Sequence, residues 1–285
     1  MLKWILPVIL CFAFNSRAQL TVKKLVELPD KMYETSGLVF YQDRYLLTHN
    51  DGGNDPEIFV LDIKTGTHRT IEIEGVKNND WEDLTVDEDG RVFIGAFGNN
   101  LNKRERSFVY VLPKNFLEKD KVEPKKIEFI YEDQLNFPPS KKEMNFDCEA
   151  FFWANDSLYF FTKCRTEPYT GVSNIYVIPD KPGEYKAKKL GSIQLCSTDW
   201  RFCSVTAADY SEKYNLVALL TYSRLYLISD FKGHQFWNGK VKSYQLNLVR
   251  QREAICFKSK NSWYMTDEYK KGLGGGNLYE VKLKE

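Results

Sequence analysis

The stretch DWEDLTVDEDGRVFIGAFG at residues 80–98 contains the unit that decides the fold. In this stretch Glu82 opens a short apolar segment at 82–86, a turn rich in Asp and Gly follows, and a second apolar segment spans 91–97. Two apolar segments joined by an Asp-Gly turn are typical of a β-hairpin. A polar residue equivalent to Glu82, followed by an apolar strand, recurs along the chain.

The same pattern occurs five times, and a third apolar strand follows in every unit. The units recur at intervals close to the roughly 40–50 residues of a four-stranded propeller blade. The second unit is longer, which fits an insertion around residues 132–144. The five opening segments are SGLVF (36–40), EDLTV (82–86), EAFFW (149–153), SVTAA (204–208) and EAICF (253–257).

The segment at 20–28 has no hairpin partner of its own, whereas the last unit supplies only three strands before the chain ends. We therefore expect residues 20–28 to pair with the strand at 276–282, which would close the ring and leave no free blade edge. The sequence predicts an all-β fold, a five-bladed β-propeller, with six blades as the alternative if 113–147 contains a degenerate blade. The 19 Phe, 6 Trp and 17 Tyr agree with a strand-rich chain.

The polar residue that opens each unit is expected to face the central channel, because the first strand of a propeller blade lines it. Three carboxylates meeting there would repel each other unless a cation compensates them. Oxygen ligands suit Ca²⁺, which takes about 6–8 of them. The alternative is that these side chains cap neighbouring strands through backbone hydrogen bonds. The lead residues, as we call them, are Ser36, Glu82, Glu149, Ser204 and Glu253, with Thr206 as an alternative to Ser204 and with Glu34, Asp80 and Asp147 as an outer acidic layer.

At these residues the chain resembles the calcium-activated nucleotidase (apyrase) family. The lead residues follow that family's order of Ser, Glu, Glu, Ser and Glu, and the resemblance implies a five-bladed propeller with a single Ca²⁺ on its axis. A weaker similarity links the chain to uncharacterised secreted bacterial propellers and to phytase-like propellers. The similar stretches are YETSGLVF (33–40), residues 80–98, EAFFW (149–153), KCRTEPY (163–169), RFCS (201–204) and EAICF (253–257).

Two functions are predicted for such a site. As a hydrolase of phosphate anhydrides or esters, the protein would bind a small phosphorylated molecule through Ca²⁺, which stabilises charge on the phosphoryl group. Arg201 and Arg252 are then expected to pair with the phosphate, and His49 or Asp51 to transfer protons. As a binding module, it would keep Ca²⁺ as a structural ion and bind an extracellular glycan or protein through aromatic side chains. Those aromatic residues are Trp81, Tyr169, Trp200 and Trp237.

Residues 1–18 are predicted to be a cleavable signal peptide, because Lys3 precedes an apolar run that ends at Phe14 and small residues follow. The remaining residues, 19–285, are expected to form a single domain that is secreted or periplasmic. Because 40 Lys+Arg balance 39 Asp+Glu, nucleic-acid binding is not expected, and neither is membrane insertion. The pairing of the cysteines in this domain stays open. They are Cys148, Cys164, Cys196, Cys203 and Cys256.

Overall fold

The structure is a computed structural model that describes residues 19–247 and 249–284. The predicted signal peptide therefore lies outside the described residues. No helix in the described part of the chain is long and apolar enough to cross a membrane. The helical elements are α1 (Trp200–Cys203) and the 3-10 turns η1 (Asp30–Met32), η2 (Phe116–Glu118), η3 (Lys141–Glu143), η4 (Glu212–Tyr214) and η5 (Phe236–Asn238).

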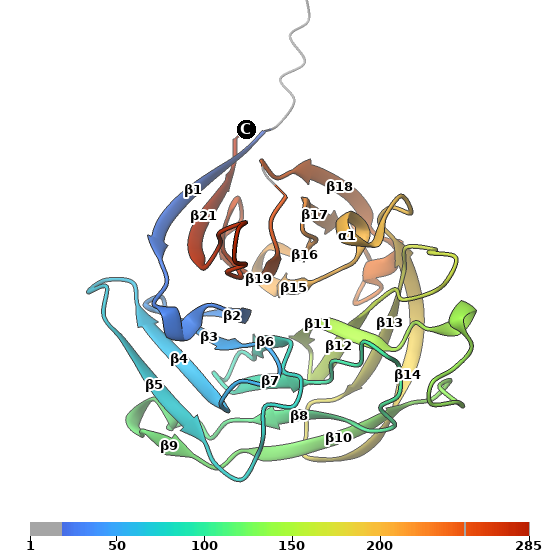
Figure 1. Cartoon of the computed structure of the whole chain (residues 1–285), viewed down its shortest axis with the longest axis horizontal. Coiled ribbons are helices and arrows are strands. Elements are labelled where there is room, and N and C mark those ends of the chain that lie inside the picture. Colours follow the sequence, from blue (N-terminus) through green and yellow to red (C-terminus); the bar gives the residue numbers. More distant parts are fainter. Residues whose placement is uncertain (1–18, 248, 285) are drawn as a thin grey trace, which may run out of the picture.

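The strands form four hydrogen-bonded sheets arranged around a central axis (Figure 1). One sheet has the order β1 (Leu20–Glu27), β21 (Asn277–Leu283), β20 (Ser262–Asp267) and β19 (Arg252–Ser259). A second has the order β2 (Thr35–Tyr41), β3 (Tyr45–Asn50), β4 (Glu57–Asp62), β5 (His68–Ile73) and β9 (Lys121–Val122). A third contains β15 (Ala207–Ser211), β16 (Leu216–Leu220), β17 (Arg224–Ser229) and β18 (Lys240–Gln245). The eight-stranded sheet has the order β6 (Asp83–Val86), β7 (Val92–Ala96), β8 (Ser107–Val111), β10 (Lys125–Tyr131), β14 (Gly183–Gln194), β13 (Val172–Pro179), β12 (Ser157–Lys163) and β11 (Asp147–Ala154).

The eight-stranded sheet consists of two antiparallel meanders, β6-β7-β8-β10 and β11-β12-β13-β14. They are joined at their outer strands, because β10 and β14 pair in parallel from Ile127 opposite Gly183 to Tyr131 opposite Ala187. The stretch at 113–147, where a sixth blade could have been hidden, adds β9 to the edge of β5 and β10 to the edge of β8. Within the described residues it forms no sheet of its own.

The innermost strands form a closed ring around the axis. In this ring β2 contacts β6, β6 contacts β11, β11 contacts β15, β15 contacts β19, and β19 contacts β2 again. These are the strands that the sequence predicts directly after the lead residues. The prediction that the repeated segments come together on one axis is therefore confirmed, and so is the all-β class.

The ends of the described chain close the ring. β1 pairs antiparallel with β21, with Leu20 opposite Leu283 and Glu27 opposite Asn277. This is the predicted pairing of residues 20–28 with 276–282. Because β1 covers β21, the last sheet has four strands although only three come from the end of the chain.

The hydrophobic core lies between neighbouring meanders, and its largest fully buried side chains are aromatic. Between the two meanders of the eight-stranded sheet, the Phe97 ring lies 5.1 Å from that of Phe151 and 5.4 Å from that of Phe160, measured between centroids. All three side chains are fully buried. Since burial of one such side chain stabilises the fold by about 1.5–3 kcal/mol, these contacts hold the two meanders in place around the axis.

A disulfide joins Cys196 to Cys203 across the short segment that carries α1. The other cysteines among the described residues are buried free thiols: Cys148, Cys164 and Cys256. The structure thus resolves the pairing that the sequence leaves open.

Candidate functional site

The five lead residues lie where the innermost strands begin, and each is nearly buried, with at most 5% of its surface exposed. Ser36 donates a hydrogen bond to the backbone oxygen of Glu82. The carboxylates of Glu82 and Glu149 interact electrostatically, and so do those of Glu149 and Glu253. The closed ring of strands therefore brings the three predicted glutamates together near the axis.

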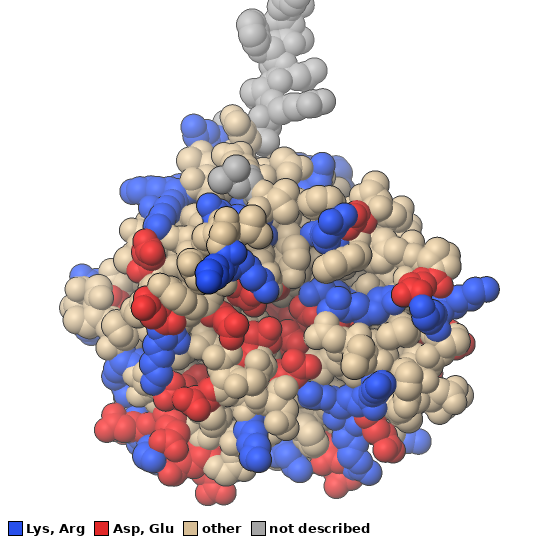
Figure 2. Space-filling view, viewed as in Figure 1, with Lys and Arg blue, Asp and Glu red and all other residues tan. Residues whose placement is uncertain are grey.

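Other carboxylates join these glutamates. Asp51 follows β3, Asp80 precedes β6, Asp147 begins β11 and Glu268 follows β20. Each of them interacts electrostatically with a lead glutamate. Figure 2 shows acidic side chains gathered at the centre of this face, where the surface is hollowed. The axial acidic cluster, as we call it, consists of Asp51, Asp80, Glu82, Asp147, Glu149, Glu253 and Glu268.

Two cations from the end of β12 neutralise one side of the cluster. The Lys163 ammonium lies 2.7 Å from Glu149 Oε2, and both side chains are about 95% buried. Arg165 Nε lies 2.6 Å from Asp147 Oδ2, and its Nη2 lies 3.2 Å from Glu149 Oε1. Burial alone would lower the pKa of Lys163, but the carboxylates of Glu149 and Glu253 raise it above its usual value. Lys163 is therefore charged, and it serves as a built-in counter-ion.

On the other side of the cluster, Lys163 and Arg165 act on Asp51 and Asp80 electrostatically but form no ion pair with them. Asp51, Asp80 and Glu82 each offer a carboxylate oxygen, and these oxygens lie within 4.8 Å of one another. Arg104 reaches Asp80 only at 3.7 Å. Burial, with added repulsion from Asp51, raises the pKa of Asp80 to about 6. Burial and then the neighbouring Glu149 raise the pKa of Glu82 well above its usual value. This side of the cluster favours bound protons or a bound cation.

The hydroxyl groups near the axis are engaged with neighbouring groups. Tyr169 Oη lies 3.4 Å from Ser204 Oγ, and Thr206 donates a hydrogen bond to the backbone oxygen of Arg252 at 2.7 Å. Tyr222 donates to Glu253 Oε1 at 2.9 Å. The bonds of Ser36 and Thr206 are of the strand-capping type that the alternative interpretation of the lead positions expects. The pairing of Glu149 with Lys163 is not of that type.

Of the four predicted catalytic residues, the structure brings only Asp51 into the axial acidic cluster. His49 is fully buried, and its ring centroid lies 5.5 Å from that of Trp81. Its Nδ1 lies 2.9 Å from the Asn50 carbonyl oxygen, and burial lowers the pKa of His49 to about 4. Arg201 is exposed on α1 and pairs with Asp199 at 2.6 Å. Arg252 is buried and donates to the Tyr222 carbonyl, and burial lowers its pKa to about 10.

The predicted aromatic contact residues differ in exposure. Trp81 is fully buried in the core, and the Trp237 ring packs against the backbone of Gly191. Trp200 is 46% exposed on α1, the helix that ends next to Ser204. Only Trp200 among these tryptophans offers a large open face.

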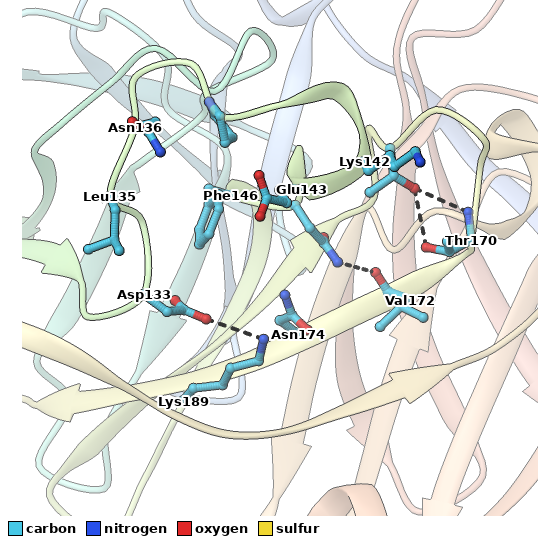
Figure 3. A pocket seen from close by; sticks show the side chains of 13 residues that line it. Asp133, Leu135, Asn136, Lys142, Glu143, Phe146, Thr170, Val172, Asn174 and Lys189 are labelled. Carbon is cyan, nitrogen blue, oxygen red and sulfur yellow. Dashed lines mark hydrogen bonds and ion pairs between the residues drawn. The ribbon is translucent and has the colours of Figure 1, made fainter.

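A second concave site lies beside the segment that carries Arg165 (Figure 3). This cavity of about 390 Å³ is formed by the predicted insertion together with β13 and β14. In this cavity Lys189 Nζ lies 3.3 Å from Asp133 Oδ2, and Asn145 donates to the Val172 carbonyl at 2.8 Å. The cavity is polar but carries no concentration of unpaired charge comparable to the axial acidic cluster.

No protein-family model matches the chain, and no curated protein matches its sequence. Solved structures do share its fold. The chain is similar to the PQQ-bound aldose sugar dehydrogenase of Streptomyces coelicolor, with 13% identity and a TM-score of 0.53 over 94% of this chain and 99% of that chain. It is similar to the allergen Mala s 1 of Malassezia sympodialis, with 11% identity and a TM-score of 0.56 over 90% and 95%. It is also similar to a gluconolactonase of Xanthomonas campestris, with 10% identity and a TM-score of 0.50 over 94% and 91%.

At these identities the likeness shows the fold, a β-propeller, and not the activity. The predicted resemblance to the calcium-activated nucleotidase family is wrong, because the propellers similar to this chain include a sugar dehydrogenase and a gluconolactonase rather than a nucleotidase. Apart from KCRTEPY (163–169), which begins at the end of β12, the short stretches that suggested the family lie at or next to the start of an innermost strand. Such starts occur in every propeller blade, so they report the geometry of the blades and not the reaction.

Proposed function

We propose that this chain is a five-bladed, calcium-binding β-propeller that hydrolyses a small ester. The blade count is supported by the ring of five innermost strands, each of which begins a meander of at least four strands when β1 is counted with the last. In this interpretation β10 and β14 are the outer strands of two neighbouring blades that pair across the gap between them.

The observation that carries the proposal is the excess of carboxylates in the axial acidic cluster. Seven carboxylates face one buried cation, Lys163, two part-buried ones, Arg165 and Arg104, and the exposed Lys270. Buried carboxylates without a compensating charge are costly and bind protons or cations. The donors are oxygen atoms, which suits a hard cation such as Ca²⁺ more than zinc or copper.

A bound Ca²⁺ would supply a Lewis acid that polarises a carbonyl group or a water molecule. The chain's own residues favour a neutral substrate over a phosphate. The cluster has an excess of negative charge, which repels a polyanion. Arg201 and Arg252, the residues predicted to hold phosphate, pair with Asp199 and with the Tyr222 carbonyl instead. A cyclic sugar ester of the kind named for the Xanthomonas gluconolactonase fits this charge distribution.

The test measures calcium binding and hydrolysis with the same preparation. Calcium should raise the melting temperature, because a ligand that binds only the folded state stabilises it by about 2.7 kcal/mol at a hundredfold excess over its Kd. Sugar lactones should be hydrolysed in calcium and not in chelator, whereas nucleotides and phosphate esters should react more slowly. The proposal is contradicted if calcium leaves the melting curve unchanged, or if lactones are hydrolysed equally fast in chelator.

The alternative function, a binding module for a glycan or protein with a structural Ca²⁺, is favoured by one observation. Trp200 and Phe202 on α1 are 46% and 36% exposed, next to the axial residue Ser204. Exposed aromatic faces suit stacking on sugar rings or on apolar side chains. Calcium stabilisation without any hydrolysis in the same panel would favour this function over the hydrolase.

A further inference from the structure

We propose that the calcium ion lies off the axis, bound by Asp51, Asp80 and Glu82, and that the built-in cation Lys163 keeps it away from Glu149 and Glu253. This inference rests on the proposed calcium binding and adds the position of the ion. Of the three lead glutamates, only Glu82 is then a calcium ligand.

The spacing of the three carboxylates fits a single ion. Calcium binds oxygens at about 2.3–2.6 Å, so two oxygens on the same ion lie at most about 5 Å apart. The oxygens offered by Asp51, Asp80 and Glu82 lie within 4.8 Å of one another. The three residues come from two neighbouring parts of the ring, the loop after β3 and the approach to β6. Further ligands can come from water and backbone oxygens, which calcium accepts.

Glu82 gives a second observation that points to a ligand. It is about 95% buried, and the charged groups that act on its carboxylate are other carboxylates, those of Glu149, Asp51, Asp80 and Asp147. The comparable buried carboxylates of the cluster do have partners, since Glu149 has Lys163, Asp147 has Arg165 and Glu253 has Tyr222. A buried carboxylate without a partner costs free energy. Its partner is therefore expected to be a ligand that binds between it and the two aspartates.

Two glycines make room for the carboxylates. A Cβ atom at Gly98 would collide with Glu82 Oε1 and with the carboxylate of Asp80, and a Cβ atom at Gly52 would lie 2.7 Å from Asp80 Oδ1. Gly52 and Gly98 do not have positive φ angles. They are therefore needed for space and not for backbone conformation, and they let two loops close onto the three carboxylates.

The other half of the cluster is already compensated. The Lys163 ammonium, 2.7 Å from Glu149, also interacts electrostatically with Glu253. A calcium ion held by Glu149 would have to displace this ammonium or lie next to it. Two like charges at such a distance repel strongly in a buried site, which favours the side of Asp51, Asp80 and Glu82.

The experiment measures calcium affinity by titration calorimetry on the full chain and its variants. Asp80→Asn should weaken calcium binding at least about tenfold, because affinity depends on the number of charged ligands. Glu268→Gln is the control, since it alters one carboxyl group of the same cluster outside the proposed ligand set; burial raises the pKa of Glu268 to about 9, so near pH 7 the substitution replaces a neutral group. It should change the affinity less than about threefold. Circular dichroism in chelator checks that each variant is folded.

The decisive variant is the double substitution Lys163→Met with Glu149→Gln, which removes an ion pair and leaves the net charge unchanged. The inference expects calcium affinity within about threefold of the original, because neither residue touches the ion. Gly98→Ala adds a steric test that keeps every charge, and it should weaken binding as strongly as Asp80→Asn.

The outcomes separate the two proposals. If the unsubstituted chain binds no calcium, the proposed function fails. If it binds calcium, but the double variant loses binding while Asp80→Asn and Gly98→Ala keep it, the off-axis site is overturned and an ion on the axis stands. Loss of binding in Asp80→Asn and Gly98→Ala, with the double variant unaffected, supports the inference.

Discussion

Lys163 and Glu82 differ in how the fold compensates a buried charge. Lys163 comes from the end of β12 and faces Glu149, so both charges have a partner inside the protein. Glu82 precedes β6 and has like charges as its nearest ionisable neighbours. The first arrangement stabilises the folded protein by itself, whereas the second depends on a proton or a ligand.

Substitution of Lys163 by methionine should destabilise the protein by about 3–5 kcal/mol, because it leaves the buried Glu149 carboxylate with the longer contact to Arg165. Methionine keeps much of the apolar stem, so little packing is lost. Urea denaturation in chelator measures the change. Lys141→Met is the control, since Lys141 pairs with Glu167 on the exposed surface and its loss should have little effect. Equal stability of the two variants would show that Lys163 is not a structural counter-ion.

At the level of elements, the innermost strands are joined by side chains rather than by backbone ladders. Asp83 on β6 accepts hydrogen bonds from the backbone N–H groups of Phe151 on β11 at 3.2 Å and Ala208 on β15 at 3.4 Å. Asp209 on β15 accepts one from Phe257 on β19 at 2.7 Å. Short carboxylates therefore bridge innermost strands that do not pair with each other through backbone hydrogen bonds.

Asp209 predicts a pH dependence of stability. Burial raises its pKa in the folded protein to about 7, from a usual value of about 3.9. The folded state thus holds this proton more tightly than the unfolded state between about pH 4 and 7. The stability that it contributes is full below this window and is lost as the pH rises through it, with a slope of at most about 1.4 kcal/mol per pH unit.

The measurement is the free energy of unfolding by urea at several pH values, for the original chain and for Asp209→Asn. Asparagine has no carboxyl proton and can still accept the hydrogen bond from Phe257. The difference between the two proteins should change across pH 4–7 and stay constant above it. The remaining carboxylates titrate in both proteins and cancel in the difference. Parallel curves over the whole range would contradict the assignment to Asp209.

At the scale of the whole molecule, we propose that the chain is exported, which would suit the disulfide and the sequence before residue 19. The bond between Cys196 and Cys203 is a feature that persists in oxidising compartments, and residues 1–18 have the pattern of a signal peptide. Expression of the full sequence should yield an exported chain that begins near Gln19. Alkylation and mass spectrometry should find these two cysteines protected until a reductant is added. An exported chain that keeps Met1, or one in which Cys196 and Cys203 are free thiols, would refute this prediction.

Much of the fold could be predicted from the sequence, because alternating apolar residues and turns repeat in each unit. The pairing of β1 with β21 followed from one strand left over at the start and one missing at the end. The lead positions followed from the same alignment. The prediction failed where it took the order of these positions as a sign of nucleotidase activity, since the starts of innermost strands are shared by propellers with different reactions.

The details of the site depend on contacts that no local pattern reveals. From the sequence, Lys163 and Arg165 are predicted only to lie at the end of a strand. The structure shows that this end faces Glu149 and Asp147. Asp51 approaches Asp80 because two loops from different units meet. The glycines at 52 and 98 were a signal of that close approach, but glycine in a loop has many other reasons to occur.

The meeting of the chain ends in one sheet has a consequence for how this polypeptide can be rearranged. Lys284 N–H donates to the Gln19 carbonyl at 3.0 Å, so a very short linker could join the two ends. New termini could then be opened at an exposed turn such as Gln42–Asp43, where circular permutation is best tolerated. The strands of the described residues form a closed ring, so the position of the termini could change without changing which strands are neighbours.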